Sequence, residues 1–193
     1  MKTMKTAGTS IEVFLSQHCD ALDIVTPINP PVAPHFPRNY GNFYNHIPAH
    51  EIRAQMGSQI WDSYFKFCVE RNPWDKVISD FHFWKNWKHH DLTFEQYLSN
   101  KIFPINFPLY AEPSDAQRII VDEVLSYERL DDELNRVFTS LGIPFQGALG
   151  VYAKSEFRID KLHYSEVFTA DQAAVINNAF SQEIALHGYQ FDS

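Results

Sequence analysis

The chain has 193 residues, 45% of them hydrophobic, and a formal net charge of −8 at pH 7. The length is sufficient to bury a core, and the hydrophobic content excludes intrinsic disorder. The negative net charge argues against a nucleic-acid partner, since binding to a phosphate backbone needs clustered Lys and Arg. An acidic chain can still have a local basic cleft, here around Lys5, Arg71 and Lys76. There is no apolar stretch of ~18 residues and no apolar signal-peptide region, and Cys19 and Cys68 do not make a disulfide framework, so we expect a cytoplasmic protein with reduced thiols and no membrane span.

The first predicted element is a short loop that opens a helix, over roughly residues 5–19. Its sequence is Lys5-Thr6-Ala7-Gly8-Thr9-Ser10, and the apolar residues that follow have the spacing of one helix face. The free N–H groups of a helix start, a glycine that permits close approach and two hydroxyl groups together favour binding of an anion. The alternative is an ordinary N-terminal turn capped by Thr9 or Ser10.

The next segment, residues 26–41, is rich in proline and irregular. It is either a surface connection or a substrate lid, because long irregular segments in compact domains often bind ligands. A short helix is predicted from about Pro48 to Met56. Pro48 separates His46 from His50, so we do not expect one continuous helix to carry both as metal ligands.

A core strand and a helix follow. The apolar residues 64–69 predict a buried parallel strand, and Asn72-Pro73 is an N-cap followed by the proline that suits a first helical position. Arg71 is then at the carboxyl edge of the strand, where open α/β sheets bind ligands, and Ser79 is about two turns into the helix. The alternative is a surface ion pair between Arg71 and Asp75.

The later elements complete an α/β pattern. The aromatic-rich residues 81–110 are expected to be mostly core, and residues 119–127 predict a strand. A helix with apolar residues from 130 to 141 is expected to end at Gly142, and a last helix begins near Thr169 and continues past residue 180. Strands that alternate with helices predict an α/β fold with a parallel sheet.

Two motifs resemble a known family. The loop at residues 5–10 and the Arg71-Asn72-Pro73 segment with Ser79 are similar to the two nucleotide-binding motifs of sulfotransferases that use 3′-phosphoadenosine 5′-phosphosulfate (PAPS). The carbohydrate-type and bacterial branch is the most similar one. The resemblance extends through Tyr127-Glu128-Arg129-Leu130 and Lys154-Ser155-Glu156 to the C-terminal end. Two departures are Met4, where the family has proline, and the three residues before the loop, where the family has a full strand.

The resemblance implies a fold and a site. The fold is a three-layer α/β/α domain over residues 1–193 with a central parallel sheet, of the P-loop nucleoside-triphosphate-hydrolase-like sulfotransferase type, with a short first strand. The implied catalytic residues are Lys5, which stabilises the leaving oxygen, and His46, the base that takes the acceptor proton. The implied nucleotide-binding residues are Lys5, Thr6, Ala7, Gly8, Thr9, Ser10, Arg71, Ser79, Lys154 and Arg158.

The expected reaction is transfer of a sulfuryl group from PAPS to a hydroxyl, and a carbohydrate or glycoconjugate is favoured as the acceptor on resemblance alone. No metal is expected, and a homo-oligomer is left open. One alternative is a catalytically inactive nucleotide-binding or scaffold protein of the same fold. Another is a small-molecule kinase, which needs acidic residues such as Asp75 and Asp122 to hold Mg²⁺.

Overall fold

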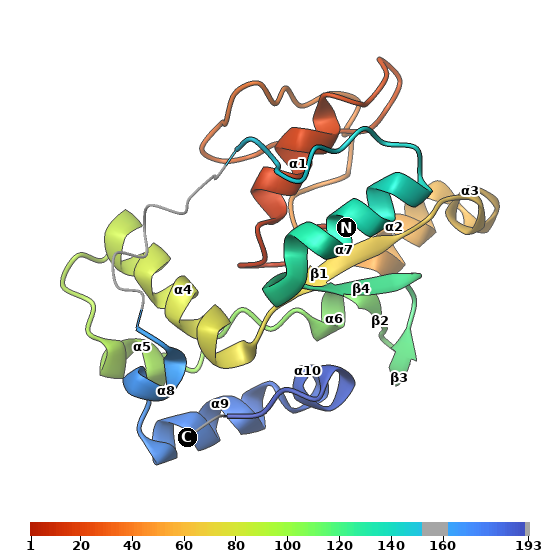
Figure 1. Cartoon of the computed structure of the whole chain (residues 1–193). Coiled ribbons are helices and arrows are strands. Elements are labelled where there is room, and N and C mark those ends of the chain that lie inside the picture. Colours follow the sequence, from red (N-terminus) through yellow and green to blue (C-terminus); the bar gives the residue numbers. More distant parts are fainter. Residues whose placement is uncertain (152–161, 192–193) are drawn as a thin grey trace. The chain divides into compact units, whose positions relative to one another are not determined.

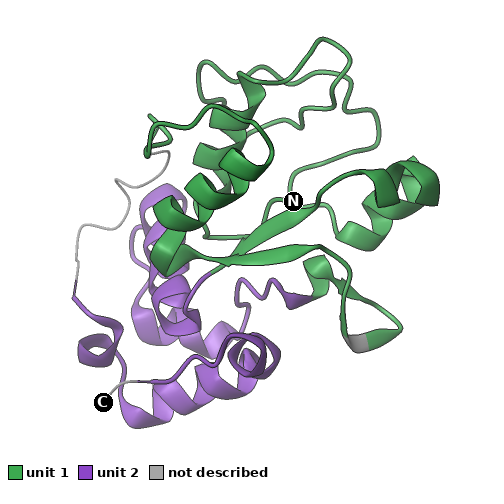
Figure 2. Cartoon of the chain, turned by 45° about the vertical axis from the view of Figure 1, so that its right-hand side comes forward, with its two compact units in different colours: residues 1–70, 108–153 green, residues 71–107, 154–193 purple. Residues whose placement is uncertain are grey.

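The computed structural model (Figure 1) describes residues 1–151 and 162–191, without the side chains of residues 116 and 117. The chain divides into two compact units (Figure 2). The first unit comprises Met1–Glu70 and Pro108–Ala153, and the second comprises Arg71–Phe107 and Lys154–Ser193. The expected single domain over residues 1–193 stays a prediction.

The first unit is built around a parallel pair of strands, β1 (Phe67–Glu70) and β4 (Glu123–Ser126). Val69 and Leu125 lie opposite each other in this pair and share one hydrophobic core with helices α1 (Gly8–Ser16) and α7 (Leu130–Ser140). Successive strand residues point to opposite faces, and Glu70 accordingly accepts a hydrogen bond from Tyr110. The parallel pairing confirms the predicted parallel strand, but the strand covers Phe67–Glu70 rather than residues 64–69, and Tyr64 and Phe65 before it are exposed.

Short elements make up the rest of the first unit. Helix α2 (Ala49–Met56) confirms the helix expected after Pro48, and α3 (Ser58–Ser63) follows it without having been predicted. Strands β2 (Ala111–Glu112) and β3 (Asp115–Ile119) form an antiparallel pair. The 3₁₀ helix η1 (Tyr127–Arg129) joins β4 to α7, and helix α6 (Phe107–Tyr110) spans the boundary between the units.

The strand predicted over residues 119–127 is wrong in its extent. Ile119 ends β3, and β4 begins only at Glu123, because a turn separates them. The Asp122 carboxylate accepts a hydrogen bond from the Lys66 amide at 2.6 Å, and the Asp122 amide donates to the Lys66 carbonyl at 2.8 Å. These bonds place the start of β4 opposite the start of β1. The apolar residues from which the strand was predicted do not reveal where it starts.

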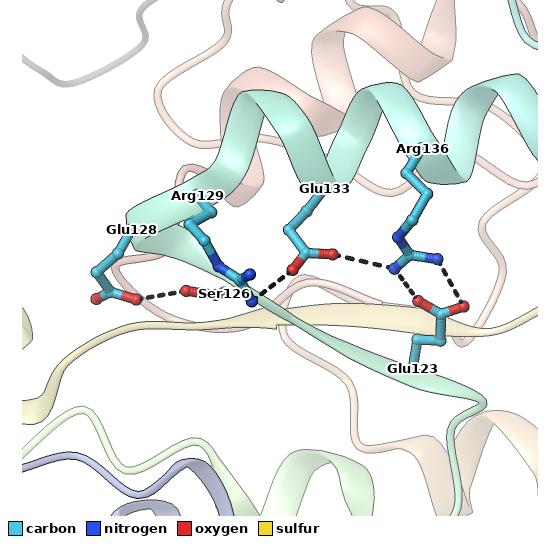
Figure 3. A network of polar contacts seen from close by, with 6 residues as sticks. All are labelled: Glu123, Ser126, Glu128, Arg129, Glu133 and Arg136. Atoms are coloured by element: carbon cyan, nitrogen blue, oxygen red, sulfur yellow. Dashed lines mark hydrogen bonds and ion pairs between the residues drawn. The ribbon is translucent and has the colours of Figure 1, made fainter.

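An ion pair joins β4 to α7 on the surface. Arg136 donates to both carboxylate oxygens of Glu123 and also to Glu133 (Figure 3). The hydrogen bonds from Arg136 hold the pKa of the Glu123 carboxyl below its ordinary value. Helix α7 ends as predicted, because Gly142 has a φ of 69° and donates to the Thr139 carbonyl at 3.2 Å.

The second unit is helical in its described part. It contains α4 (Pro73–Trp87), α5 (Phe94–Asn100), α8 (Tyr164–Val167), α9 (Ala170–Ala179) and α10 (Ser181–His187). One aromatic-rich core joins α4, α5, α8 and α9, which confirms that the aromatic-rich segment is mostly packing. The Asn72 side chain accepts from the amides of Trp74 and Asp75, so the predicted N-cap of α4 is confirmed.

Two helix boundaries differ from expectation. Helix α1 begins at Gly8 with Ala7 as its N-cap residue and no side-chain cap, so a turn capped by Thr9 or Ser10 is wrong. The expected last helix begins as predicted with a capping box at Thr169, but it divides into α9 and α10 at Phe180, which is fully buried and has non-helical backbone angles.

The structure is thus mixed α/β, with a two-stranded parallel sheet in the first unit. Among the residues that it describes, no helix is both long and apolar enough to cross a membrane. Cys19 and Cys68 are both free thiols, and burial raises the pKa of the Cys68 thiol above its ordinary value.

Candidate functional site

The loop before α1 is held against strand β1 by its threonines. The Thr3 hydroxyl donates to the Val69 carbonyl at 2.5 Å and lies 2.8 Å from the Thr6 hydroxyl, which in turn donates to the Thr3 carbonyl at 3.2 Å. Both side chains are buried. Thr6, a predicted nucleotide-binding residue, therefore uses its hydroxyl to fix the loop beside the strand.

The loop backbone alternates in handedness. Lys5 and Ala7 have φ values of 62° and 59°, whereas Thr6 does not have a positive φ. A left-handed conformation is costly for residues with a Cβ, so two of them within three residues mark a constrained turn. Alternation of this kind turns successive N–H groups toward one side, which is how backbone concavities bind anions. Helix α1 begins directly after this turn, and its N-cap residue, Ala7, provides no side-chain acceptor for the first N–H groups.

Gly8 is required by the chain itself. A Cβ at this position would lie 2.7 Å from Cγ of Lys2 and 3.3 Å from the Thr3 carbonyl oxygen. The expectation that Gly8 lets the backbone approach a ligand stays a prediction. The close neighbour in the structure is the segment that precedes the loop, and a larger residue would push that segment away from the start of α1.

An open pocket of about 490 Å³ lies beside the start of α1. Its lining comes from the loop and α1, from η1 and the first turn of α7, and from residues 149 and 151: Ala7, Ser10, Tyr127, Glu128, Arg129, Leu130, Asp131, Asp132, Leu149 and Val151. All of these residues belong to the first unit. The pocket therefore has one wall at a helix N-terminus, which favours anions, and another wall that carries three carboxylates and one guanidinium.

Hydrogen bonds hold the charged wall in place. The Ser126 hydroxyl donates to Glu128 at 2.8 Å, and Arg129 donates to Glu133 at 2.9 Å (Figure 3). Sequence reasoning did not identify this wall as part of a site. The available signal was its position directly after a strand and at the start of a helix, because the carboxyl ends of parallel strands are where such folds bind ligands.

His46 lies next to the segment that leads into the loop. Its Nδ1 is 3.1 Å from the Lys2 carbonyl oxygen. A carbonyl only accepts, so Nδ1 carries the hydrogen, and in the neutral ring Nε2 is then the unprotonated nitrogen. His46 has a φ of 63° and precedes α2, whereas His50 is inside α2. The structure thus brings the expected base and the loop together within one unit.

Arg71 and Ser79 belong to the second unit. Arg71 is buried, and its Nε donates to Asp75 Oδ2 at 2.8 Å while its Nη2 donates to the same oxygen. The ion pair that we gave as the alternative for Arg71 is therefore present. Ser79 lies in α4 and is half-buried. Lys154 and Arg158 lie outside the described residues.

Lys76 is not part of a basic cleft, so that expectation is wrong. Its side chain is completely buried, with Nζ 4.0 Å from Glu183 Oε1 and 4.7 Å from the centre of the Phe180 ring. It lies on the buried side of α4, where the amphipathic helix meets the core of the second unit.

The acidic residues considered for Mg²⁺ both take part in ion pairs. Asp75 pairs with Arg71, and Asp122 lies 3.0 Å from the ammonium of Lys66. Within residues 1–151 and 162–191, there is no group of three His, Cys, Asp or Glu side chains that could hold a metal ion.

One comparison with known proteins finds a relative. The chain is 38% identical over 101 residues to a protein of Archaeoglobus fulgidus whose name says only that it is uncharacterized. The matched region covers 51% of this chain and 84% of the archaeal protein. No protein-family model matches the chain, and no solved structure matches it.

Proposed function

We propose that the chain, which belongs to the same family as the Archaeoglobus fulgidus protein, is a sulfotransferase that moves a sulfuryl group from PAPS to a hydroxyl. We favour a carbohydrate or glycoconjugate as the acceptor and a cytoplasmic location. The proposed fold is the P-loop sulfotransferase type, a three-layer α/β/α domain. The layering within the first unit supports this proposal, because α1 and α7 pack on one face of the parallel pair and Tyr110 lies on the other.

One observation carries the proposal. The constrained turn at residues 5–7 connects a segment bonded to β1 with the N-terminus of α1, and this helix start opens on a pocket. In nucleotide-binding α/β proteins a strand, an anion-binding loop and a helix in this order form the phosphate-binding unit. Here residues 1–3 lie beside β1 in the place of that strand, without forming one. The loop residues fit the terminal phosphosulfate of PAPS, which supplies the sulfuryl group when it is bound.

The residues have distinct roles in the proposed reaction. The backbone N–H groups of the loop bind the phosphosulfate, and the Lys5 ammonium stabilises the negative charge that develops on the bridging oxygen. His46 takes the acceptor proton on Nε2, because its Nδ1 donates to the Lys2 carbonyl. The bond between sulfur and the acceptor oxygen forms as the bond between sulfur and the bridging oxygen breaks. The electron pair leaves with 3′-phosphoadenosine 5′-phosphate.

Two further assignments belong to the proposal. Arg71 and Ser79 bind the 3′-phosphate of the donor, an assignment that rests on the motif in the sequence. The three carboxylates in the pocket wall, Glu128, Asp131 and Asp132, support a neutral, hydroxyl-rich acceptor over a heavily sulfated one. The loop N–H groups and Lys5 would offset the negative charge of the donor, whereas a second polyanion beside these carboxylates would be repelled.

Transfer of labelled sulfate tests this function. The chain is incubated with PAPS labelled in the sulfuryl group and with a panel of neutral sugars, sulfated sugars, peptides and aryl alcohols. We expect label on a hydroxylated acceptor, with neutral sugars ahead of sulfated ones. Binding of 3′-phosphoadenosine 5′-phosphate without transfer to any acceptor would instead indicate an inactive binding protein.

A further inference from the structure

Glu12, in the second turn of α1, joins three parts of the first unit. Its Oε2 accepts a hydrogen bond from the Lys2 ammonium at 2.8 Å, and its Oε1 accepts one from the Thr26 hydroxyl at 2.6 Å. The Nε2 of His35 lies 3.8 Å from Oε1. The side chains of Lys2 and Glu12 are 12% and 18% exposed, so water screens their attraction less than it would on an open surface.

Through Lys2, Glu12 acts on the loop and on His46. The Lys2 carbonyl accepts the hydrogen bond from His46 Nδ1, and the Lys2 stem lies directly over Gly8 at the start of α1. Lys2 therefore contacts both the His46 ring and the start of α1. The ion pair with Glu12 holds Lys2 in that position.

Through Thr26 and His35, Glu12 also acts on the proline-rich segment. Val25 and Arg38 pair through two backbone hydrogen bonds of 2.9 and 3.0 Å, which close residues 25–38 into a loop. Figure 1 shows this segment running beside α1. The His35 side chain is only 2% exposed, and among the described residues its Nε2 has no hydrogen-bond partner. The Glu12 carboxylate is thus an acceptor close to a buried imidazole nitrogen that has no hydrogen bond within the described part of the chain.

We propose that Glu12 is a positioning residue for the site in the first unit. It holds Lys2 so that the Lys2 carbonyl keeps the hydrogen of His46 on Nδ1, and it fastens the proline-rich segment to α1. The role of His46 as a base rests on the proposed function. The effects of Glu12 on the Lys2 carbonyl and on the proline-rich segment do not depend on that function. The proline-rich segment, residues 25–38, is on this account a flap that Glu12 holds against α1, rather than a simple surface connection.

The first test reads the His46 tautomer directly. Nitrogen-15 NMR of the histidine rings distinguishes the two neutral tautomers, and His46→Gln assigns the signal. We expect the Nδ1–H form in the wild type and in Glu51→Ala, a matched control in which a glutamate of the same unit loses its bond to Tyr44. Glu12→Ala should shift His46 toward the tautomer mixture of a free imidazole. An unchanged His46 tautomer in Glu12→Ala would overturn this half of the proposal.

The second test measures opening of the flap. Trypsin cleaves after Arg38, and in Glu12→Ala we expect cleavage at this site to rise by roughly tenfold, which corresponds to ~1.4 kcal/mol lost from the closed form. Glu12→Gln keeps an oxygen that accepts from Thr26 but loses the charge that attracts Lys2. It should therefore change the His46 tautomer with a smaller rise in cleavage. Equal cleavage in the wild type, Glu12→Ala and Glu51→Ala would refute the fastening.

Both readouts remain valid if the chain transfers no sulfate, so failure of the proposed function is separable from failure of this inference. If the chain does transfer sulfate, Glu12→Ala should lower turnover by a larger factor than it weakens binding of 3′-phosphoadenosine 5′-phosphate. Should Glu12→Ala fail to fold, Glu12→Gln carries both tests, since it preserves the shape of the side chain. An unchanged His46 tautomer in a folded Glu12→Gln would contradict the proposal equally.

Discussion

Lys76 and Glu183 form a buried ion pair in the second unit, with 4.0 Å between Nζ and Oε1 and side chains that are 0% and 1% exposed. Oε1 of Glu183 also accepts from the backbone amides of Asn106 and Phe107, at 3.0 and 3.1 Å. The pair thus ties α4, α10 and the segment before α6 together.

Removal of Glu183 should destabilise the second unit strongly. In Glu183→Ala, Lys76 loses its buried counter-charge and two backbone amides lose their acceptor, so we expect a loss of ~3–5 kcal/mol in the free energy of unfolding. The double variant Lys76→Met with Glu183→Gln should recover part of this loss, because both charges of the pair are removed together. Denaturation in urea measures both, and a loss below ~1 kcal/mol in Glu183→Ala would show that the pair is not needed.

Lys5 should act on the chemical step more than on binding. We expect Lys5→Ala to reduce sulfate transfer far more than it weakens binding of 3′-phosphoadenosine 5′-phosphate, because its strongest contact forms in the transition state. Lys101→Ala is the matched control, since Lys101 is also a lysine with a positive φ, 52° compared with 62° for Lys5, but lies in the other unit. Equal losses of turnover and product affinity in Lys5→Ala would make Lys5 a binding residue only.

His46 should give the reaction its pH dependence. The base must be neutral to accept a proton, so the rate should rise with pH as the imidazole loses its charge, and His46→Ala should remove this rise. Turnover should fall by ~10²–10⁴, with donor binding near normal. His50→Ala is the control. If His50→Ala abolishes turnover and His46→Ala does not, the base is one helical turn further along the chain.

The ion pair between Arg71 and Asp75 offers a sharp test of the 3′-phosphate assignment. In Arg71→Ala the preference for nucleotides with a 3′-phosphate should disappear, with a loss of ~1.5–3 kcal/mol in binding. In Asp75→Asn the guanidinium keeps its charge and loses a competing carboxylate, so the preference should persist or grow. If Arg71→Ala still prefers nucleotides with a 3′-phosphate, Arg71 forms the ion pair with Asp75 but does not bind the 3′-phosphate.

Local chemistry explains which elements were predictable. The N-cap at Asn72, the glycine at 142 and the capping box at Thr169 each act within a few residues, so the starts of α4 and α9 and the end of α7 were readable from the sequence. The turn before β4 was not, because it depends on a bond between Lys66 and Asp122, 56 residues apart. The β2–β3 pair and α3 are too short to show a hydrophobic period.

The same distinction applies to the site. A loop that opens a helix near residue 5 was readable because its composition is local, but the helix begins at Gly8 rather than after Ser10. The pocket wall at residues 127–132 was missed, since it comes beside the loop only through the pairing of β4 with β1. The hydrogen bond from His46 to Lys2 joins residues 44 apart and likewise could not be derived from spacing.

The central claim is that the chain binds the PAPS nucleotide, and calorimetric titration with its desulfated product tests this most directly. The wild-type chain is titrated with 3′-phosphoadenosine 5′-phosphate and, as the matched control, with adenosine 5′-monophosphate. We expect binding of the first, tighter than the second by roughly 10- to 150-fold, the equivalent of one charge-assisted contact of ~1.5–3 kcal/mol. No binding of either nucleotide, or equal affinity for the two, would contradict the sulfotransferase proposal.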